Sequence, residues 1–162
     1  ELLRMKLENF EKIAPDLNVM MNFERKETRV ELHKGKKVYQ TLLKDMIACV
    51  GKNEEVFIIG VDENTLQKKV APIYLKQYLN AINTKNIKEK IIIKKGGKKI
   101  KSPNLTYKEV DKKFIGNTAQ LIYHNKVAVF ILGTPYHLIV IDNKEVANTY
   151  KKQFELLWKV AK

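Results

Sequence analysis

A nearly continuous apolar run occupies residues 55–61 and reads Glu55-Val56-Phe57-Ile58-Ile59-Gly60-Val61. A strand that is apolar on both faces is typical of the interior of a sheet that helices cover on both sides. Asp62 follows directly and stands where the N-cap of a helix is expected. The run therefore predicts a central strand that leads into a helix.

Strands and helices alternate around this run. Residues 29–33 alternate polar and apolar side chains like a half-buried strand, and residues 36–50 have the apolar spacing of a helix. A helical pattern that breaks near Ala71-Pro72 follows Asp62, and residues 90–94 form another apolar strand. This order predicts βαβ units with parallel strand pairs and right-handed crossovers.

The last third of the chain has a different pattern. Apolar strands at residues 119–123, 126–132 and 136–141 are separated by short turns, which predicts antiparallel neighbours. A long amphipathic helix follows, and Asp142 and Glu145 have the spacing of a capping box at its start. The predicted fold class is α/β: a mixed sheet with βαβ units first, antiparallel strands later and a long C-terminal helix.

The N-terminal residues have the spacing of a helix that packs against another helix. Leu3, Leu7 and Phe10 lie on one stripe and are the candidate dimerisation contacts. We therefore expect residues 1–15 to form a linker or dimerisation helix and residues 28–162 to form the α/β effector domain. Because the chain starts inside this helix without a cap, we also expect more protein upstream.

The charge of the chain is strongly positive. Among 162 residues, 31 Lys and Arg stand against 18 Asp and Glu, which gives a net charge of +13. Lysine supplies almost all of it, and lysine suits weak attraction to polyanions better than the bidentate recognition typical of arginine. A compositional bias toward lysine, as in heat-adapted proteins, explains the same excess without any binding role. Both interpretations stay open.

One basic run is the candidate for nonspecific anion binding. It comprises Lys94, Lys95, Lys98, Lys99 and Lys101, with two glycines between. Lysines of this density can follow a phosphate backbone, but the run lacks the interleaved aromatic residues on which single-stranded bases stack. A solvated hairpin tip is the other interpretation.

Several classes of protein are excluded by absent patterns. No apolar run approaches the roughly 20 residues of a membrane-spanning helix, so we expect a cytoplasmic protein without a membrane partner. Cys49 is the only cysteine, which excludes an intramolecular disulfide, and we expect it to be buried. The histidines are scattered singly, so no metal is predicted. No phosphate-loop or dinucleotide-binding motif is present, and no cofactor is predicted.

His124-Asn125-Lys126 is the only enzyme-like motif. It resembles the H-x-K motif of the phospholipase D and nuclease superfamily, in which the histidine attacks phosphorus and the lysine steadies the phosphoryl oxygens. The alternation of a strand would place His124 and Lys126 on one face. In that superfamily an aspartate and a G-S-x-N element follow, but here Ile131 and Leu138-Ile139 hold those positions. We therefore predict no catalysis, and a degenerate phosphodiesterase remains an alternative.

Three stretches resemble the TrmB-like family of archaeal transcription regulators. They are Glu55-Val56-Phe57-Ile58-Ile59-Gly60-Val61-Asp62-Glu63, then Tyr123-His124-Asn125-Lys126-Val127-Ala128-Val129, and the ending, which runs from Asn143 to Tyr150 and then from Phe154 to Lys162. The resemblance implies a non-catalytic phospholipase D-like fold preceded by an N-terminal helix. It also implies a helix-turn-helix DNA-binding domain upstream and a glycine at position 124, where this chain has His124.

These patterns together predict a non-enzymatic regulatory domain that forms a homodimer. It senses an unidentified small molecule or holds the dimer together, and it reaches DNA through an upstream domain outside this chain. The candidate ligand site lies near strand ends, at Gly60, Asp62, His124 and Lys126. The alternative is a lysine-rich module that binds nucleic acid nonspecifically.

Overall fold

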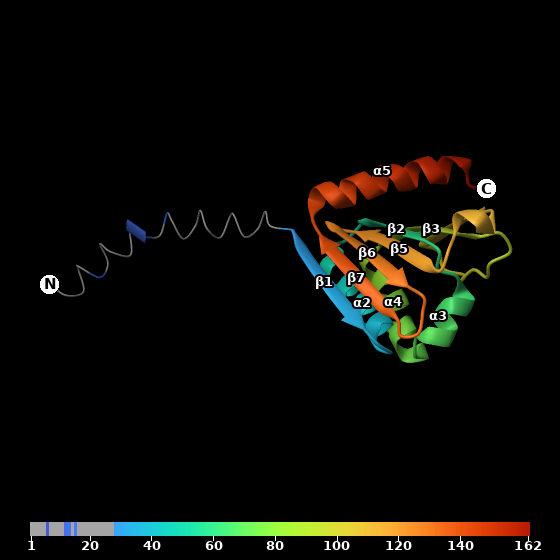
Figure 1. The fold of residues 1–162 in the computed structure, drawn as a ribbon, viewed down its shortest axis with the longest axis horizontal. Coiled ribbons are helices and arrows are strands. Elements are labelled where there is room, and N and C mark those ends of the chain that lie inside the picture. The colour runs from blue at the N-terminus through green and yellow to red at the C-terminus, as the bar shows by residue number, and fades with distance from the viewer. Residues whose placement is uncertain (1–5, 7–11, 14, 16–27) are drawn as a thin grey trace.

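The computed structural model describes residues 28–162 together with Lys6, Lys12, Ile13 and Pro15 (Figure 1). The candidate dimerisation contacts Leu3, Leu7 and Phe10 lie outside the described residues. The elements are β1 (Arg29–Lys34), α2 (Val38–Cys49), β2 (Glu55–Ile59), α3 (Glu63–Lys69), α4 (Pro72–Lys85), β3 (Lys88–Lys94), β4 (Leu105–Val110), the 3-10 helix η1 (Lys112–Phe114), β5 (Thr118–Tyr123), β6 (Lys126–Ile131), β7 (His137–Asp142) and α5 (Lys144–Val160).

One seven-stranded sheet organises the domain, in the order β1-β7-β6-β5-β2-β3-β4. The strands β2, β3 and β4 run parallel to one another, and the other neighbouring pairs are antiparallel. This arrangement confirms the predicted mixed sheet with a parallel part first and antiparallel strands later.

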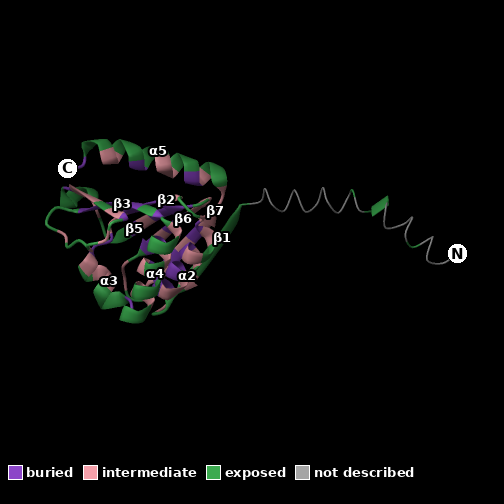
Figure 2. Ribbon diagram, turned by 180° about the vertical axis from the view of Figure 1, so that it is seen from behind, coloured by how far each residue is buried: buried purple, intermediate pink, exposed green. Residues whose placement is uncertain are grey.

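Helices cover both faces of the sheet. Figure 1 shows α5 along one face and α2, α3 and α4 on the other, and Figure 2 shows that α5 turns its buried residues toward the sheet. On β2, Val56 and Ile58 pack in the core on the α2 side, whereas Phe57 packs with Phe154 of α5 at 5.0 Å between ring centroids. The central apolar strand is therefore apolar on both faces because both faces are buried, as predicted.

The position of β1 corrects the sequence prediction. We expected a half-buried strand within a βαβ unit, but β1 is an edge strand that pairs antiparallel with β7. Its side chains Val30 and Leu32 are 63% and 68% exposed. Alternating side chains predict a strand, but they do not specify which strand lies beside it.

Strand β4 was not predicted from the sequence. It pairs in parallel with β3, with Tyr107 opposite Ile91. Its sequence, LTYKEV, carries both a lysine and a glutamate, so its apolar content is too low for detection by hydrophobicity.

The start of α5 also differs from the predicted capping box. Asp142 is the last residue of β7, and Asn143 is the N-cap, with its side-chain oxygen accepting a hydrogen bond from the Val146 amide at 3.0 Å. At the other end, the Lys108 ammonium donates to the Trp158 and Ala161 carbonyl oxygens at 2.8 and 3.1 Å. Within the described residues, no helix is both long enough and apolar enough to cross a bilayer.

Candidate functional site

His124 lies on a turn, not on a strand. Strand β5 ends at Tyr123 and β6 begins at Lys126, so His124 and Asn125 form the connection between them. The φ angle of His124 is +50°, in the left-handed region. A positive φ at the first central residue is a feature of hairpin turns that favour glycine there. This conformation explains in physical terms why the family resemblance implies glycine at position 124.

The surroundings of His124 do not form a catalytic constellation. Its ring nitrogen Nδ1 lies 3.6 Å from Oε2 of Glu54, and the two side chains are 45% and 39% exposed. Asn125 and Lys151 line the same shallow crevice beside α5. An exposed pair at this distance contributes little, so the imidazole is neither desolvated nor firmly oriented.

Lys126 faces the other side of the sheet. Its ammonium donates to both carboxylate oxygens of Asp45 on α2, at 2.8 and 3.0 Å, and its side chain is only 14% exposed. The Tyr123 hydroxyl donates to Asp45 at 2.7 Å, and the Cys49 thiol donates to it at 3.4 Å. Strand alternation therefore does not bring His124 and Lys126 to one face, because His124 is outside the strand.

Asp45, Lys126, Tyr123 and Cys49 form a group that we call the Asp45 cluster. Its two opposite charges, on Asp45 and Lys126, are paired with each other. Partial burial acts to raise the pKa of the Asp45 carboxyl, but hydrogen bonds from Lys126 and Tyr123 outweigh it and hold that pKa below its usual value. Burial, together with the bond to Asp45, raises the pKa of the Tyr123 phenol. The lysine charge is thus already paired. Cys49 is half-buried and hydrogen-bonded rather than fully buried as expected.

The positions that replace the superfamily aspartate and glycine-serine pair are apolar and far from His124. Ile131 is the last residue of β6, at the opposite end of that strand, and is 37% exposed. Leu138 is fully buried in the core on the α2 side. Among the described residues, no group of three or more His, Cys, Asp or Glu side chains gathers as a metal site.

Gly60 and Asp62 lie at the opposite edge of the sheet from His124, where edge means the line along which strands begin or end. Gly60 has a φ of +92°, and a Cβ there would stand 2.8 Å from the Thr118 carbonyl oxygen, so only glycine fits. Asp62 is 6% exposed and caps α3 by accepting hydrogen bonds from the amide and hydroxyl of Thr65 at 2.9 and 2.8 Å. The four candidate ligand residues are therefore distributed over two sheet edges and do not form one site.

Lysines concentrate at the edge that holds Gly60 and Asp62. Strand pairing brings the ends of β1, β2, β3, β4 and β6 to this edge together with the starts of β5 and β7. We call it the lysine edge, and its members are Lys34, Lys36, Lys37, Lys68, Lys69, Lys94, Lys95, Lys98, Lys99, Lys112 and Lys113.

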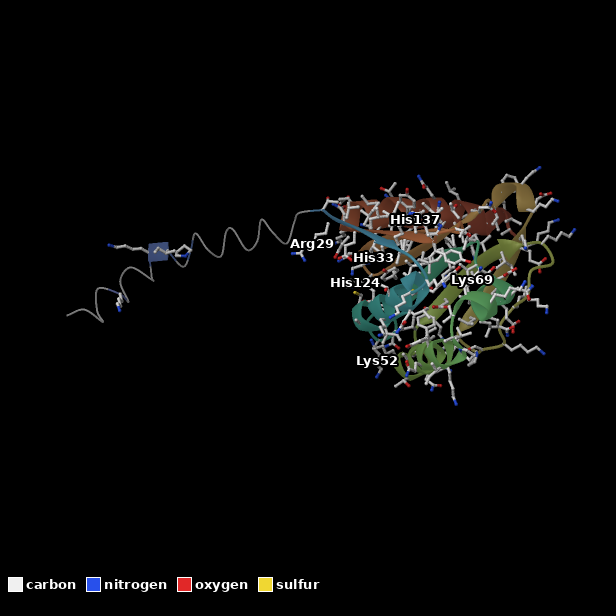
Figure 3. The ribbon with its side chains drawn as sticks, turned by 60° about the horizontal axis from the view of Figure 1, so that its bottom comes forward. Arg29, His33, Lys52, Lys69, His124 and His137 are labelled. Atoms are coloured by element: carbon white, nitrogen blue, oxygen red, sulfur yellow. The ribbon has the colours of Figure 1, made fainter. Side chains whose placement is uncertain are left out.

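Few of these charges are neutralised in the described part of the chain. Lys99 pairs with Glu109 at 2.8 Å and Lys94 approaches Asp62 at 3.8 Å. Figure 3 places Lys69 away from His124 and Lys52, which lie on the other side of the domain. The basic run predicted from sequence contributes Lys94, Lys95, Lys98 and Lys99 to this edge, while Lys101 lies farther along the same loop.

Sequence reasoning missed two polar residues that face the core. Asp45 was not singled out because its partners are distant in the chain. Glu89 was missed because the predicted strand began one residue after it, although Glu89, Ile91 and Ile93 alternate on one face. That alternation was the available signal for a buried carboxyl group.

Comparison with known proteins gives structural matches alone. No protein-family model and no curated protein sequence matches the chain. TrmBL2, an archaeal chromatin protein whose structure shows a novel mode of DNA binding, has a TM-score of 0.56 at 18% identity, covering 100% of this chain and 65% of that one. Two further structures also match. Nuc from Salmonella typhimurium, a phospholipase D family member, has a TM-score of 0.58 at 12% identity, covering 84% of this chain and 97% of that one. NucT from Helicobacter pylori has a TM-score of 0.57 at 14% identity, covering 83% of this chain and 98% of that one.

These matches show that the chain has a phospholipase D-like fold, as the resemblance implied. At such identities the likeness concerns the fold alone. The chain spans 65% of TrmBL2, and its neighbours include both a chromatin protein and a phospholipase D family member.

Proposed function

We propose that the chain is a non-catalytic regulatory domain of the TrmB-like kind, acting in the archaeal cytoplasm as part of a homodimeric transcription regulator. The observation that carries this proposal is the separation of the two motif residues. His124 lies exposed on a turn, and Lys126 is bound to Asp45 on the other side of the sheet. A phosphoryl group beside His124 therefore lacks Lys126, the lysine of the motif, to steady it.

The proposed roles of the parts are those that the family resemblance implies. Residues 1–15 serve as the linker and dimerisation helix through Leu3, Leu7 and Phe10, and residues 28–162 form the effector domain. DNA is bound by an upstream domain. TrmBL2, a protein described by its DNA binding, matches over 100% of this chain, which supports this assignment.

Turnover of a chromogenic phosphodiester tests the non-catalytic part. We expect the unmodified chain and His124→Ala to release product at the same rate as buffer. Lys126→Met serves as a second variant. A rate above background that disappears in either variant contradicts the proposal.

Oligomeric state tests the regulatory part. Sedimentation equilibrium of the whole chain should give a dimer at tens of micromolar, and Leu7→Asp with Phe10→Asp should give a monomer. Because the substitutions lie outside residues 28–162, circular dichroism of the variant should keep the strand signal. A monomeric unmodified chain contradicts the dimer.

A second candidate function is nonspecific binding of nucleic acid by the lysine edge. The observation that favours it is the gathering of lysines from most of the chain at one sheet edge. Phosphate contacts by lysine release counterions, so the logarithm of the binding constant falls linearly with the logarithm of salt concentration.

Paired charge variants distinguish this function from general basicity. Lys95→Gln with Lys98→Gln removes two charges from the lysine edge, and Lys52→Gln with Lys144→Gln removes two from the opposite edge. We expect the first pair to reduce the salt slope for duplex DNA by about 1.8, from roughly 0.9 per contact, and the second pair to leave it unchanged. Equal effects of the two pairs exclude a defined binding edge.

A further inference from the structure

Strand β1 is the end strand of the sheet and has one unpaired side (Figure 1). Its residues pair with β7 in an unbroken register, and no other strand among the described residues pairs with it. At the other end of the sheet, β4 is partly engaged, because Glu109 and Lys162 exchange backbone hydrogen bonds there. An unpaired strand side is a template for a further strand, and β1 has neither a proline nor a bulge to prevent such pairing.

The pairing pattern identifies the backbone groups of β1 that face outward. The Gly35 amide donates to the Tyr136 carbonyl oxygen at 2.9 Å, and these two residues continue the register of β1 and β7. Opposite residues of an antiparallel pair alternate between hydrogen-bonded and non-hydrogen-bonded pairs. Residues 29, 31 and 33 therefore bond to β7, whereas the amide and carbonyl groups of Val30, Leu32 and Lys34 point away from the sheet.

Two of these outward-facing residues also carry exposed apolar side chains. Val30 and Leu32 are 63% and 68% exposed, and they lie opposite Ile141 and Ile139 of β7. Ile139 in turn lies opposite Val129, which packs in the core beneath α5. The apolar surface on the α5 side of the sheet therefore continues past the helix to the unpaired side of β1.

A second copy of β1 fits this side in one antiparallel register. When Leu32 of one copy lies opposite Leu32 of the other, Val30 lies opposite Lys34, and all the outward-facing groups are in hydrogen-bonded pairs. Glu31 of each copy then lies opposite His33 of the other, in the pairs whose side chains are closest. The adjacent registers place Glu31 opposite Glu31 or His33 opposite His33. Only the register centred on Leu32 gives each carboxylate an imidazole partner.

We propose that β1 pairs with β1 of a second copy in this register and joins the two sheets into one. The inference rests on the proposed homodimer and adds the contact that aligns its two copies of residues 28–162. A contact of one short strand pair is too small to hold two free copies together. Residues 1–15 supply the main contact, and tethering raises the effective concentration of one β1 at the other.

The length of the chain allows both contacts in one dimer. In this register Arg29 of each copy lies opposite Gly35 of the other, so the two β1 strands begin about 20 Å apart. Residues 16–27 connect residues 1–15 to Thr28 in each copy. A segment of this length spans at most about 40 Å. The N-terminal residues of the two copies can therefore meet while the β1 strands pair.

The test is disulfide formation between single cysteines in the whole chain, with Cys49→Ser as the common background. At Leu32→Cys the two Cα atoms lie about 5.5 Å apart, within the range of a disulfide. Val30→Cys is the matched control, since residue 30 has similar exposure on the same face but its two Cα atoms lie about 14 Å apart. Salt at about 0.3 M screens the repulsion between chains of charge +13. Under mild oxidation, Leu32→Cys should link at least about tenfold faster than Val30→Cys.

Charge variants in the Leu32→Cys background test the register independently. Glu31→Lys replaces the carboxylate that faces His33 of the other copy with a cation, and it should slow linking about threefold to tenfold. Adding His33→Glu restores opposite charges across the strand pair and should restore the rate. Both residues lie on an edge strand and contact each other within one copy at 3.0 Å, and circular dichroism checks that each variant keeps the fold.

The outcomes separate this contact from the homodimer itself. A dimeric chain in which Leu32→Cys links no faster than Val30→Cys overturns the β1 contact and leaves the homodimer in place. Failure of His33→Glu to restore linking overturns the proposed register. A monomeric unmodified chain in sedimentation overturns the homodimer and the β1 contact together.

Discussion

The Asp45–Lys126 pair offers a sharp test of whether Lys126 is a structural residue. Lys126→Met removes the ammonium but keeps most of the aliphatic side chain, and Asp45→Asn removes the carboxylate charge but keeps the shape. The ammonium donates to both oxygens of Asp45, and the side chains are 14% and 30% exposed. The pair is thus intermediate between a surface and a buried ion pair.

The expected magnitude follows from that intermediate exposure. Exposed pairs contribute about 0–1 kcal/mol, and breaking a fully buried pair costs about 3–5 kcal/mol. We therefore expect each single substitution to lower the free energy of unfolding by about 2 kcal/mol. Because each one removes the same contact, the double variant should lose less than the sum, with a coupling energy of about 1–2 kcal/mol.

Urea denaturation followed by the fluorescence of Trp158, the only tryptophan, measures these energies. Urea is preferred because guanidinium is a salt that screens charges. The matched control is the Lys90–Glu55 pair, whose atoms are 2.9 Å apart but whose side chains are 37% and 40% exposed. Its coupling should stay near or below 0.5 kcal/mol. A coupling for Asp45 and Lys126 no larger than this control refutes the structural role.

The pH dependence of this coupling has a definite sign. The pKa of the Asp45 carboxyl is lower in the folded state than its usual value. Its stabilisation is therefore fully present above the unfolded pKa and is lost as pH falls through the folded pKa. The coupling measured at neutral pH should disappear in strong acid.

Three further predictions concern single residues. Burial raises the pKa of the Glu89 carboxyl from 4.5 to about 7. The free energy of unfolding of the unmodified chain, relative to that of Glu89→Gln, should therefore fall by at most about 3 kcal/mol as pH rises through that window. Paired urea titrations measure this difference, and a difference that does not change with pH contradicts the prediction. Gly60→Ala should lower the free energy of unfolding by about 2–3 kcal/mol in the same assay, because the φ of residue 60 is +92° and a Cβ there would stand 2.8 Å from the Thr118 carbonyl oxygen. A change below about 0.5 kcal/mol contradicts this. His124→Gly should leave the free energy of unfolding unchanged or raise it by up to about 1 kcal/mol, with a matching rise in melting temperature, whereas His124→Val should lower both. The reverse order of the two variants contradicts the left-handed turn.

The sequence was sufficient for features that depend on local patterns. The apolar run at residues 55–61 predicts an interior strand, and both faces of β2 are buried in the structure. Asp62 caps the following helix as expected. The short turns of the last third predict the antiparallel order of β5, β6 and β7. In each case the determining residues are neighbours in the chain.

Features that depend on residues distant in the chain could not be predicted from the sequence. Alternation in β1 does not reveal that it pairs with β7 at the sheet edge, and nothing near Lys126 identifies Asp45 as its partner. The proposed ligand site failed to form one cluster for a similar reason. Gly60 and His124 both follow strands, but β2 and β5 are antiparallel, so their ends lie at opposite edges.

The edge position of β1 has a consequence for folding during synthesis. The Asn143 side chain donates a hydrogen bond to the Thr28 hydroxyl at 2.7 Å, across 115 positions of sequence. Strand β1 therefore leaves the ribosome long before β7, and at translation rates of about 5–20 residues per second it waits on the order of ten seconds for its partner. During that interval the backbone groups of β1 that later pair with β7 are open to any other strand, including β1 of a neighbouring nascent chain. Among the described strands, the last to be made, β7, therefore covers one side of the first, β1.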